Sequence, residues 1–314
     1  MKKPVAAFAA DIHWMTRTPE YRKETCPFHE VIGRKIGVWR DYLRLHKIPG
    51  FVCGDMFDIS RSFNDWWTLR HLLKAKFWPL VQLYVVPGQH DRFHHNAADN
   101  MTSLNALFDE AGLAMEDLPK RDCVIANGTF VFYGTAWGEK PKPTFETNEL
   151  GKHILVTHKT LWHKKPVYPG QTEGNVAVEA AKYHELGYDM VFSGDNHKAF
   201  DATVGGVEFH NIGAFTRMSV DLRDQQPRFC VLFDDMSVES VYVGEKDVFD
   251  LDRSDADKGR EIEKDGFSEA LAGGFEYGST FKGSLEKIVA EGKCGELVLN
   301  EQQRNLLRDI NNSI

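Results

Sequence analysis

Short apolar runs and helically spaced apolar positions alternate along the first two thirds of the chain. Several runs have the length and β-branched or aromatic content of buried strands: Val5–Ala10, Phe51–Cys53, Val81–Val86, His153–Thr157 and Met190–Ser193. Between them, apolar residues recur at a spacing of three to four, which predicts amphipathic helices. These helices are expected over residues 30–47, 66–76, 104–112 and 176–186.

The second half of the pattern contains neighbouring strands with few helices. Runs at residues 130–133, 207–212, 229–233 and 238–243 predict strands, and the last two are joined as a hairpin at residues 234–237. Strands that alternate with helices early and adjoin one another late favour a layered α/β sandwich over a purely doubly wound sheet.

Composition changes near residue 245, where charge rises, glycines cluster and apolar runs shorten. We therefore predict a catalytic domain over residues 1–244 and a C-terminal extension over residues 245–314. Two short helices are expected in the extension, at residues 285–290 and 301–310.

Overall charge and cysteine content narrow the class of protein. The 314-residue chain is 42% hydrophobic and carries a net charge of −8, so it has no global basic field for nucleic acid. Its five cysteines are odd in number and scattered, which is typical of reduced thiols in a cytoplasmic protein. No stretch is long enough to predict a membrane span.

Polar side chains follow five of the predicted strands. The clusters are Asp11-Ile12-His13, Asp55 with Asp58, Gln89-His90-Asp91, His158, and Asp195-Asn196-His197. Ligands of open α/β sheets collect at the carboxyl ends of strands. Because a carboxylate has two oxygens, we expect Asp55 to bridge two metal ions whose other ligands come from the remaining clusters.

These motifs, DIH, GDMFD, GQHD, VTH and GDNH, resemble the signature of the calcineurin-like metallophosphoesterase superfamily in order and spacing. The resemblance extends from residue 5 to about residue 220 and implies two mixed β-sheets flanked by helices. Asp58 is followed by Ile59-Ser60 and His90 by Asp91, unlike the protein phosphatases of the superfamily. The stretch Asn211–Arg217 is similar to one in the SbcD-type DNA-repair exonucleases.

The resemblance implies a role for each motif residue. The first metal would be held by Asp11, His13, Asp55 and His197, and the second by Asp55, Gln89, His158 and Asp195. His90 would act at the leaving group, with Asp91 orienting it, and Asp58 would lie outside the ligand set.

Two residues depart from the family pattern, and both belong to the second metal site. Gln89 replaces an asparagine and Asp195 replaces a histidine. The resulting oxygen-rich ligand set favours manganese, with magnesium and zinc left open.

The function implied by the resemblance is phosphodiester hydrolysis, with DNA as the expected substrate. Two alternatives stay open: a phosphodiesterase or phosphatase acting on a small molecule or nucleotide, and a binding subunit with weakened catalysis. A coiled-coil ATPase partner for the extension and a homodimer are further expectations.

Other residues near the motifs have simpler interpretations. The helical spacing of Trp66, Trp67 and Trp78 predicts core packing rather than stacking on bases. Arg61, Arg92 and Arg217 lie near motif loops, where contacts within the protein are expected more than contacts with phosphate oxygens.

Overall fold

The computed structural model describes most of the first 250 residues and little beyond them. The described residues are 2–23, 26–76, 81–96, 101–110, 113–121, 124–126, 128–144, 151–244, 249–250, 252, 293–294 and 297–298. The chain divides into two compact units, residues 1–249 and 250–314. The second unit contains the antiparallel pair β13 (Lys293–Cys294) and β14 (Leu297–Val298). The two helices predicted in the extension lie outside the described residues.

The first unit contains two six-stranded mixed sheets, which confirms the predicted fold class. In the first sheet the order is β12-β11-β1-β2-β3-β4, and β1 to β4 are parallel. The strands are β1 (Pro4–Ala9), β2 (Gly50–Val52), β3 (Leu83–Val85), β4 (Met115–Asp117), β11 (Arg228–Phe233) and β12 (Val238–Tyr242). The predicted hairpin joins β11 and β12.

The second sheet has the order β5-β6-β7-β8-β10-β9, and its four central strands are parallel. The strands are β5 (Val124–Ala126), β6 (Phe130–Thr135), β7 (Lys152–Thr157), β8 (Met190–Ser193), β9 (Phe200–Val204) and β10 (Val207–Asn211). Strands β4, β5 and β9 were not predicted; β4 and β5 have three residues each, and β9 is half-exposed at a sheet edge.

Aromatic side chains fill the layer between the two sheets. The rings of Phe8 and Phe192, one from each sheet, stack with their centroids 3.6 Å apart. Phe51 and Phe132 pack beside them, and Cys53 is fully buried in the same layer. Burial holds the pKa of the Cys53 thiol well above its usual range, which agrees with an inert core cysteine.

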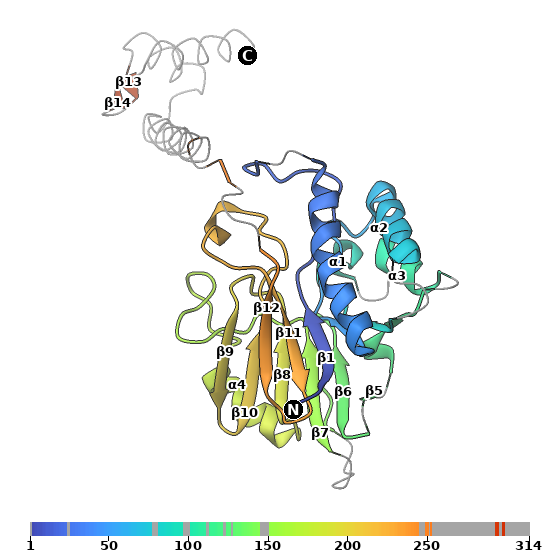
Figure 1. Ribbon diagram of the computed structural model, residues 1–314. Coiled ribbons are helices and arrows are strands. Elements are labelled where there is room, and N and C mark those ends of the chain that lie inside the picture. Colours follow the sequence, from blue (N-terminus) through green and yellow to red (C-terminus); the bar gives the residue numbers. More distant parts are fainter. Residues whose placement is uncertain are drawn as a thin grey trace. The chain divides into compact units, whose positions relative to one another are not determined.

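Helices cover the outer faces of both sheets. Figure 1 shows α1 (Phe28–His46), α2 (Phe63–Lys76) and α3 (Ser103–Phe108) gathered on one side, and these pack on the first sheet. Helix α4 (Val176–Glu185) packs on the second sheet. Three short 3₁₀ helices span Phe93–His95, Leu118–Lys120 and Val220–Leu222. None of the described helices is both long and apolar enough to cross a bilayer.

The α1 sequence shows why this helix packs as it does. Its predicted apolar positions Ile32, Ile36, Trp39 and Leu43 are all buried against the first sheet. The helix ends where Lys47 adopts a left-handed conformation, with φ 54°, so the chain turns directly into β2.

One tryptophan differs from its prediction. Trp66 is partly buried, but Trp67 is 45% exposed, and Trp78 lies outside the described residues. Trp67 lines a cavity of about 620 Å³ between α1 and α2, whose lining also includes Trp14, His29 and His71. Core packing was the wrong expectation for Trp67.

Candidate metal centre

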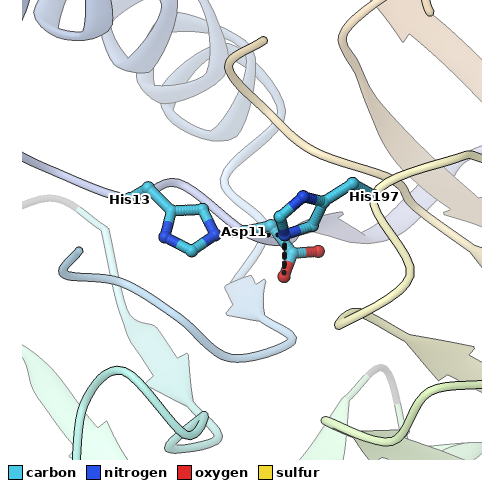
Figure 2. A group of neighbouring side chains, drawn as sticks. All are labelled: Asp11, His13 and His197. Atoms are coloured by element: carbon cyan, nitrogen blue, oxygen red, sulfur yellow. Dashed lines mark hydrogen bonds and ion pairs between the residues drawn. The ribbon is translucent and has the colours of Figure 1, made fainter. Parts of the chain in front are cut away.

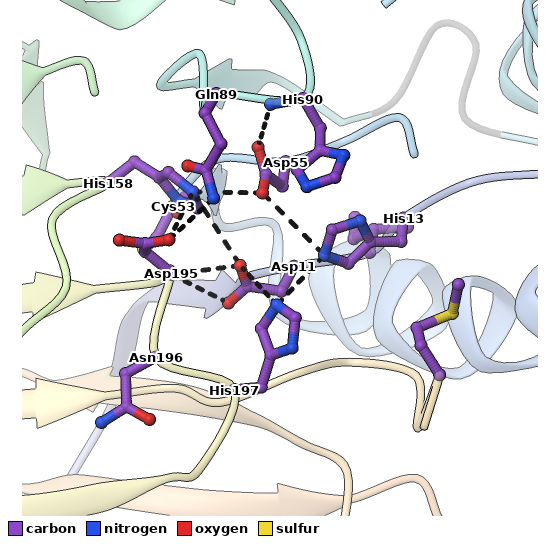
Figure 3. Close-up of polar contacts among 12 residues, drawn as sticks. Asp11, His13, Cys53, Asp55, Gln89, His90, His158, Asp195, Asn196 and His197 are labelled. Atoms are coloured by element: carbon purple, nitrogen blue, oxygen red, sulfur yellow. Dashed lines mark hydrogen bonds and ion pairs between the residues drawn. The ribbon is translucent and has the colours of Figure 1, made fainter. Parts of the chain in front are cut away.

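Five strands bring the predicted ligands to one place. Asp11 follows β1, Asp55 follows β2 and Gln89 follows β3 of the first sheet, while His158 follows β7 and Asp195 follows β8 of the second. Figure 3 shows these side chains, with His13, His90 and His197, arranged around a common centre. The centre therefore lies across the line where the two sheets meet.

Asp11, His13 and His197 form what we call the first half of the site (Figure 2). The Nε2 atoms of His13 and His197 are 3.2 Å apart, and His197 Nε2 is 3.8 Å from Asp11 Oδ1. The lone pairs of two imidazole nitrogens at this distance repel each other unless a proton or a cation lies between them. The donor set therefore fits a divalent ion.

Asp55 faces both halves of the site. Its Oδ2 atom is 3.9 Å from His13 Nε2 and 3.3 Å from His158 Nε2. Its Oδ1 atom accepts the backbone N–H of His90 at 2.9 Å. Burial opposes ionisation, but the neighbouring histidines His158, His13 and His90 outweigh it and lower the pKa of Asp55. One oxygen of this carboxylate, Oδ2, thus faces both halves, while Oδ1 is held by the backbone.

Gln89, His158 and Asp195 form what we call the second half of the site. The His158 Nε2 atom is 3.9 Å from Asp195 Oδ1, and Gln89 Nε2 donates to the same oxygen at 2.8 Å. On its other side, His158 Nδ1 contacts the Cys53 carbonyl oxygen at 2.6 Å, so Nδ1 carries a hydrogen and Nε2 faces the carboxylates.

The charge state of His158 reflects this position. Burial disfavours the imidazolium form, but Asp55, Asp11 and Asp195 together raise the pKa of His158 to about 10. A metal ligand must be deprotonated, so a cation here would replace the proton that His158 otherwise holds.

Among the buried atoms without a hydrogen-bond partner, three lie on Asp55 or in the second half: Asp55 Oδ2, Gln89 Oε1 and His158 Nε2. Buried polar groups are normally paired, and leaving one unpaired costs roughly 1–3 kcal/mol. Asp55 Oδ2 and Gln89 Oε1 carry free lone pairs, and His158 Nε2 gains one when its proton leaves. These atoms can bind a cation, so the second half also fits a metal ion.

Strained backbone positions the ligands. Asp11, His13, Asp55 and Asp195 all lie in the left-handed region, with φ values of 48°, 45°, 50° and 71°. Non-glycine residues rarely adopt this conformation, and each instance costs about 1–3 kcal/mol. Four instances within one cluster indicate that the loops are shaped for ligand placement rather than for stability.

The motif glycines allow the loops to approach one another. A Cβ atom on Gly88 would lie 2.0 Å from Asp55 Oδ1, and one on Gly54 would lie 2.0 Å from His158 Nδ1. Only glycine leaves room for the carboxylate and the imidazole at these distances.

His90 has an exposed ring at the edge of the centre. Its Nδ1 contacts the Asp58 carbonyl oxygen at 2.8 Å, so the hydrogen lies on Nδ1 and Nε2 is directed away from that carbonyl. The ring packs edge-on against His13, with centroids 5.0 Å apart. The Asp58 carboxylate in turn is 3.5 Å from His13 Nδ1, so Asp58 supports both rings.

The expected role of Asp91 is wrong in one respect. Its carboxylate does not hold the His90 ring but accepts backbone N–H groups of Met56, Phe57 and Gly88. Burial and the charge of Asp55 raise the pKa of Asp91 to about 6 despite these bonds. Asp91 therefore fixes the loop after β2 against the loop after β3.

Residues 211–217 connect two of the ligand loops. The Asn211 side chain donates to the Asn196 carbonyl oxygen at 2.6 Å, and the Thr216 hydroxyl donates to the Ile12 carbonyl oxygen at 3.0 Å. This segment thus fixes the loop that carries His197 against the loop that carries His13.

The arginines near the motif loops contact the protein itself. Arg61 donates to the Met101 carbonyl oxygen at 2.8 Å, Arg92 pairs with Glu139 at 2.7 Å, and Arg217 is buried. These contacts agree with the structural interpretation of the three side chains.

Thr160 is a site residue that the sequence reasoning missed. Its hydroxyl donates to Asp195 Oδ2. The one available signal was its position two residues after His158, on the same loop, since a lone threonine carries no motif of its own.

Comparison with known proteins gives a family match. The model of the calcineurin-like phosphoesterase family matches residues 6–199. No curated protein matches the chain.

Solved structures resemble the chain weakly. A predicted phosphoesterase from Streptococcus pneumoniae is 14% identical, with 79% of this chain and 94% of that chain covered and a TM-score of 0.38. An archaeal phosphodiesterase is 13% identical, with 77% and 100% covered and a TM-score of 0.38. A mutant of Vps29 from Entamoeba histolytica is 17% identical, with 76% and 99% covered and a TM-score of 0.34. Likeness at this level carries no argument about activity.

Proposed function

The chain belongs to the calcineurin-like phosphoesterase family, and from this premise we propose that it hydrolyses phosphodiesters at a centre of two divalent ions. The observation that carries the proposal is the buried cluster in which Asp55 Oδ2 faces His158 Nε2 at 3.3 Å and Gln89 Oε1 has no hydrogen-bond partner. Family membership and the Asp/His clusters support a metal-dependent phosphoester hydrolase.

The proposed ligands divide between the two halves of the site. Asp11, His13, Asp55 and His197 would hold the first ion, and Asp55, Gln89 and His158 would hold the second, with Asp195 beside them. When bound, two such ions supply an activated water and stabilise the charge that develops on the attacking and leaving oxygens.

His90 is the proposed proton donor to the leaving oxygen. Because the Nδ1 hydrogen is held by the Asp58 carbonyl, Nε2 is the ring atom through which a proton would pass to the leaving oxygen. The exposed position of the ring lets a substrate reach it, and the backbone bond to Asp55 fixes its place relative to the centre.

DNA is the proposed substrate, in a repair exonuclease or endonuclease of the SbcD type. The support is the similarity of residues 211–217 to the nuclease branch, together with their position against two ligand loops. A coiled-coil ATPase partner of residues 245–314, a homodimer and a cytoplasmic location belong to the same proposal.

Manganese is the proposed native ion at the second half, because the donors there are mostly hard oxygens with a single imidazole. Tight, stoichiometric zinc at both halves would contradict this assignment. The measurement is metal analysis of protein loaded separately with manganese, magnesium and zinc.

The test of function is a digestion series with labelled single-stranded and double-stranded linear DNA, beside a chromogenic phosphodiester. Each substrate is incubated with manganese, magnesium or a chelator, and the variant Asp55→Asn serves as the inactive control. We expect manganese-dependent cleavage of DNA. Cleavage of the small ester alone would support a small-molecule phosphodiesterase, and cleavage of neither would support a binding subunit.

A further inference from the structure

Two residues that depart from the family pattern contact each other. Gln89 and Asp195 are 106 positions apart in the sequence, yet Gln89 Nε2 donates to Asp195 Oδ1 at 2.8 Å. Figure 3 shows the amide and the carboxylate facing one another at the edge of the centre. We propose that Asp195 acts by positioning Gln89, so that Gln89 Oε1 and not an Asp195 oxygen is the donor offered to the second ion.

The carboxylate of Asp195 already has a partner on each oxygen. Oδ1 accepts the Gln89 amide hydrogen, and Oδ2 accepts the Thr160 hydroxyl. The Asp195 backbone N–H also donates to both oxygens of Asp11, at 3.1 and 3.2 Å. These contacts fix both the backbone and the side chain of Asp195 without any metal bond.

The orientation of the Gln89 amide follows from the carboxylate. An amide has a donor end and an acceptor end, and the carboxylate of Asp195 accepts only from the donor end. The opposite orientation would place Gln89 Oε1 against a carboxylate oxygen, which is repulsive. Asp195 therefore forces Oε1 away from itself, and Oε1 is left buried with no hydrogen-bond partner.

Distances within the centre favour the same assignment. His158 Nε2 is 3.3 Å from Asp55 Oδ2 but 3.9 Å from Asp195 Oδ1. Among the residues that the structure describes, three groups of acidic, His or Cys donors are close enough to share an ion. His158 belongs to the group with Asp11 and Asp55, and Asp195 belongs to none of the three.

The two departures then form one unit. A glutamine is one methylene longer than the asparagine of the family, so its amide needs a partner that fixes its orientation. A carboxylate at position 195 supplies that partner, and Thr160 holds the carboxylate in turn. Groups that orient a ligand from outside commonly change metal affinity by about 10–100-fold.

The test is a double-mutant cycle on metal affinity, measured by titrating metal-free full-length protein with manganese chloride in a calorimeter at fixed pH. This inference rests on the proposed two-ion centre. The variants are Gln89→Ala, Asp195→Ala and the double variant. We expect each single variant to weaken binding of the second ion by about 10–100-fold. We expect the double variant to bind the second ion at most about threefold more weakly than Gln89→Ala does, because Asp195 acts through Gln89.

Two further variants separate positioning from folding and from bulk charge. Thr160→Val removes the hydroxyl that holds Asp195 and leaves the side-chain volume nearly unchanged. We expect a several-fold lower affinity for the second ion and an unchanged affinity for the first. Asp224→Asn removes an exposed carboxylate whose partner is Arg223, and unchanged affinity is expected.

The outcomes are distinguishable. If the losses of Gln89→Ala and Asp195→Ala multiply in the double variant while the wild type binds two ions, Asp195 is an independent ligand and this inference alone is overturned. If the wild type binds no second ion, both this inference and the proposed function are overturned. Circular dichroism of each variant confirms that it is folded before titration.

Discussion

The two halves of the centre are built differently. In the first half, His13 and His197 point ring nitrogens at each other at 3.2 Å, beside Asp11. In the second half, Gln89, Asp195 and Thr160 are already linked by hydrogen bonds to one another. In the first half the two rings contact each other, whereas in the second half the Asp195 carboxylate and the Gln89 amide hydrogen are already engaged by protein partners, which leaves Gln89 Oε1 and His158 Nε2 for an ion.

This difference bears on how the two ions bind. A donor that is free of other partners loses nothing when it turns to a cation, but a donor held by protein hydrogen bonds must keep or exchange them. We therefore expect the first ion to bind more tightly and the second to exchange more readily.

Replacing Asp55 with asparagine is expected to weaken metal binding at both halves of the site, because this carboxylate faces both. Activity should fall by more than the ~10⁴-fold upper range of a single proton-transfer group. Metal analysis should show loss of both ions. If Asp55→Asn still bound one full equivalent of metal and kept the wild-type rate of hydrolysis, the two halves would be independent.

Replacing His90 with alanine is expected to lower turnover by about 10²–10³-fold, since its proposed work is proton transfer to the leaving oxygen. Metal content should stay at the wild-type level, because the variant keeps the backbone N–H that holds Asp55. The matched control is His94→Ala, on the same loop, with turnover unchanged. Equal losses of metal and turnover in His90→Ala would assign His90 to metal binding.

Replacing Gly88 with alanine tests the packing beneath the second half. The added methyl group would lie 2.0 Å from Asp55 Oδ1, so the loop must shift. A displacement near 1 Å at a reacting group costs about 10²-fold in rate. The control Gly37→Ala lies in α1, where the nearest atom to the new methyl is 4.0 Å away, so unchanged activity is expected.

Proton release should accompany binding at the second half. In the metal-free protein the pKa of His158 is raised to about 10 from 6.5. The protonated ring stabilises the folded state fully below pH 6.5, and this contribution is lost as pH rises through 10. A cation must displace the proton, so the affinity should fall by up to about tenfold for each pH unit below 10.

Calorimetry in buffers of different ionisation enthalpy measures that release. About one proton per second ion is expected at neutral pH. If no proton leaves, His158 is not a ligand of the second ion.

Much of this centre could be predicted from the sequence because its ligands directly follow predicted strands. Asp11 and Asp55 follow runs that contain parallel neighbours β1 and β2, and parallel strands end at the same edge. The apolar spacing of α1 likewise predicted which face is buried, since burial follows helical periodicity.

The remaining features depend on contacts between loops, which no local pattern encodes. Asp91 bonds three backbone N–H groups because two loops come close together at Gly88. Nearly every residue has a backbone N–H, so the sequence does not reveal these partners. The pairing of Gln89 with Asp195 spans 106 positions. Each departure was visible alone, but only the fold shows that they compensate.

The proposed ligands come from the ends of strands in both sheets, so bound ions would join the two sheets beyond the aromatic layer that already packs them. Any group that binds the folded state alone stabilises it, by about 2.7 kcal/mol at 100 times its dissociation constant. A cell starved of the native ion would then hold this protein in a form that proteases degrade faster. Its abundance, as well as its activity, would follow the metal supply.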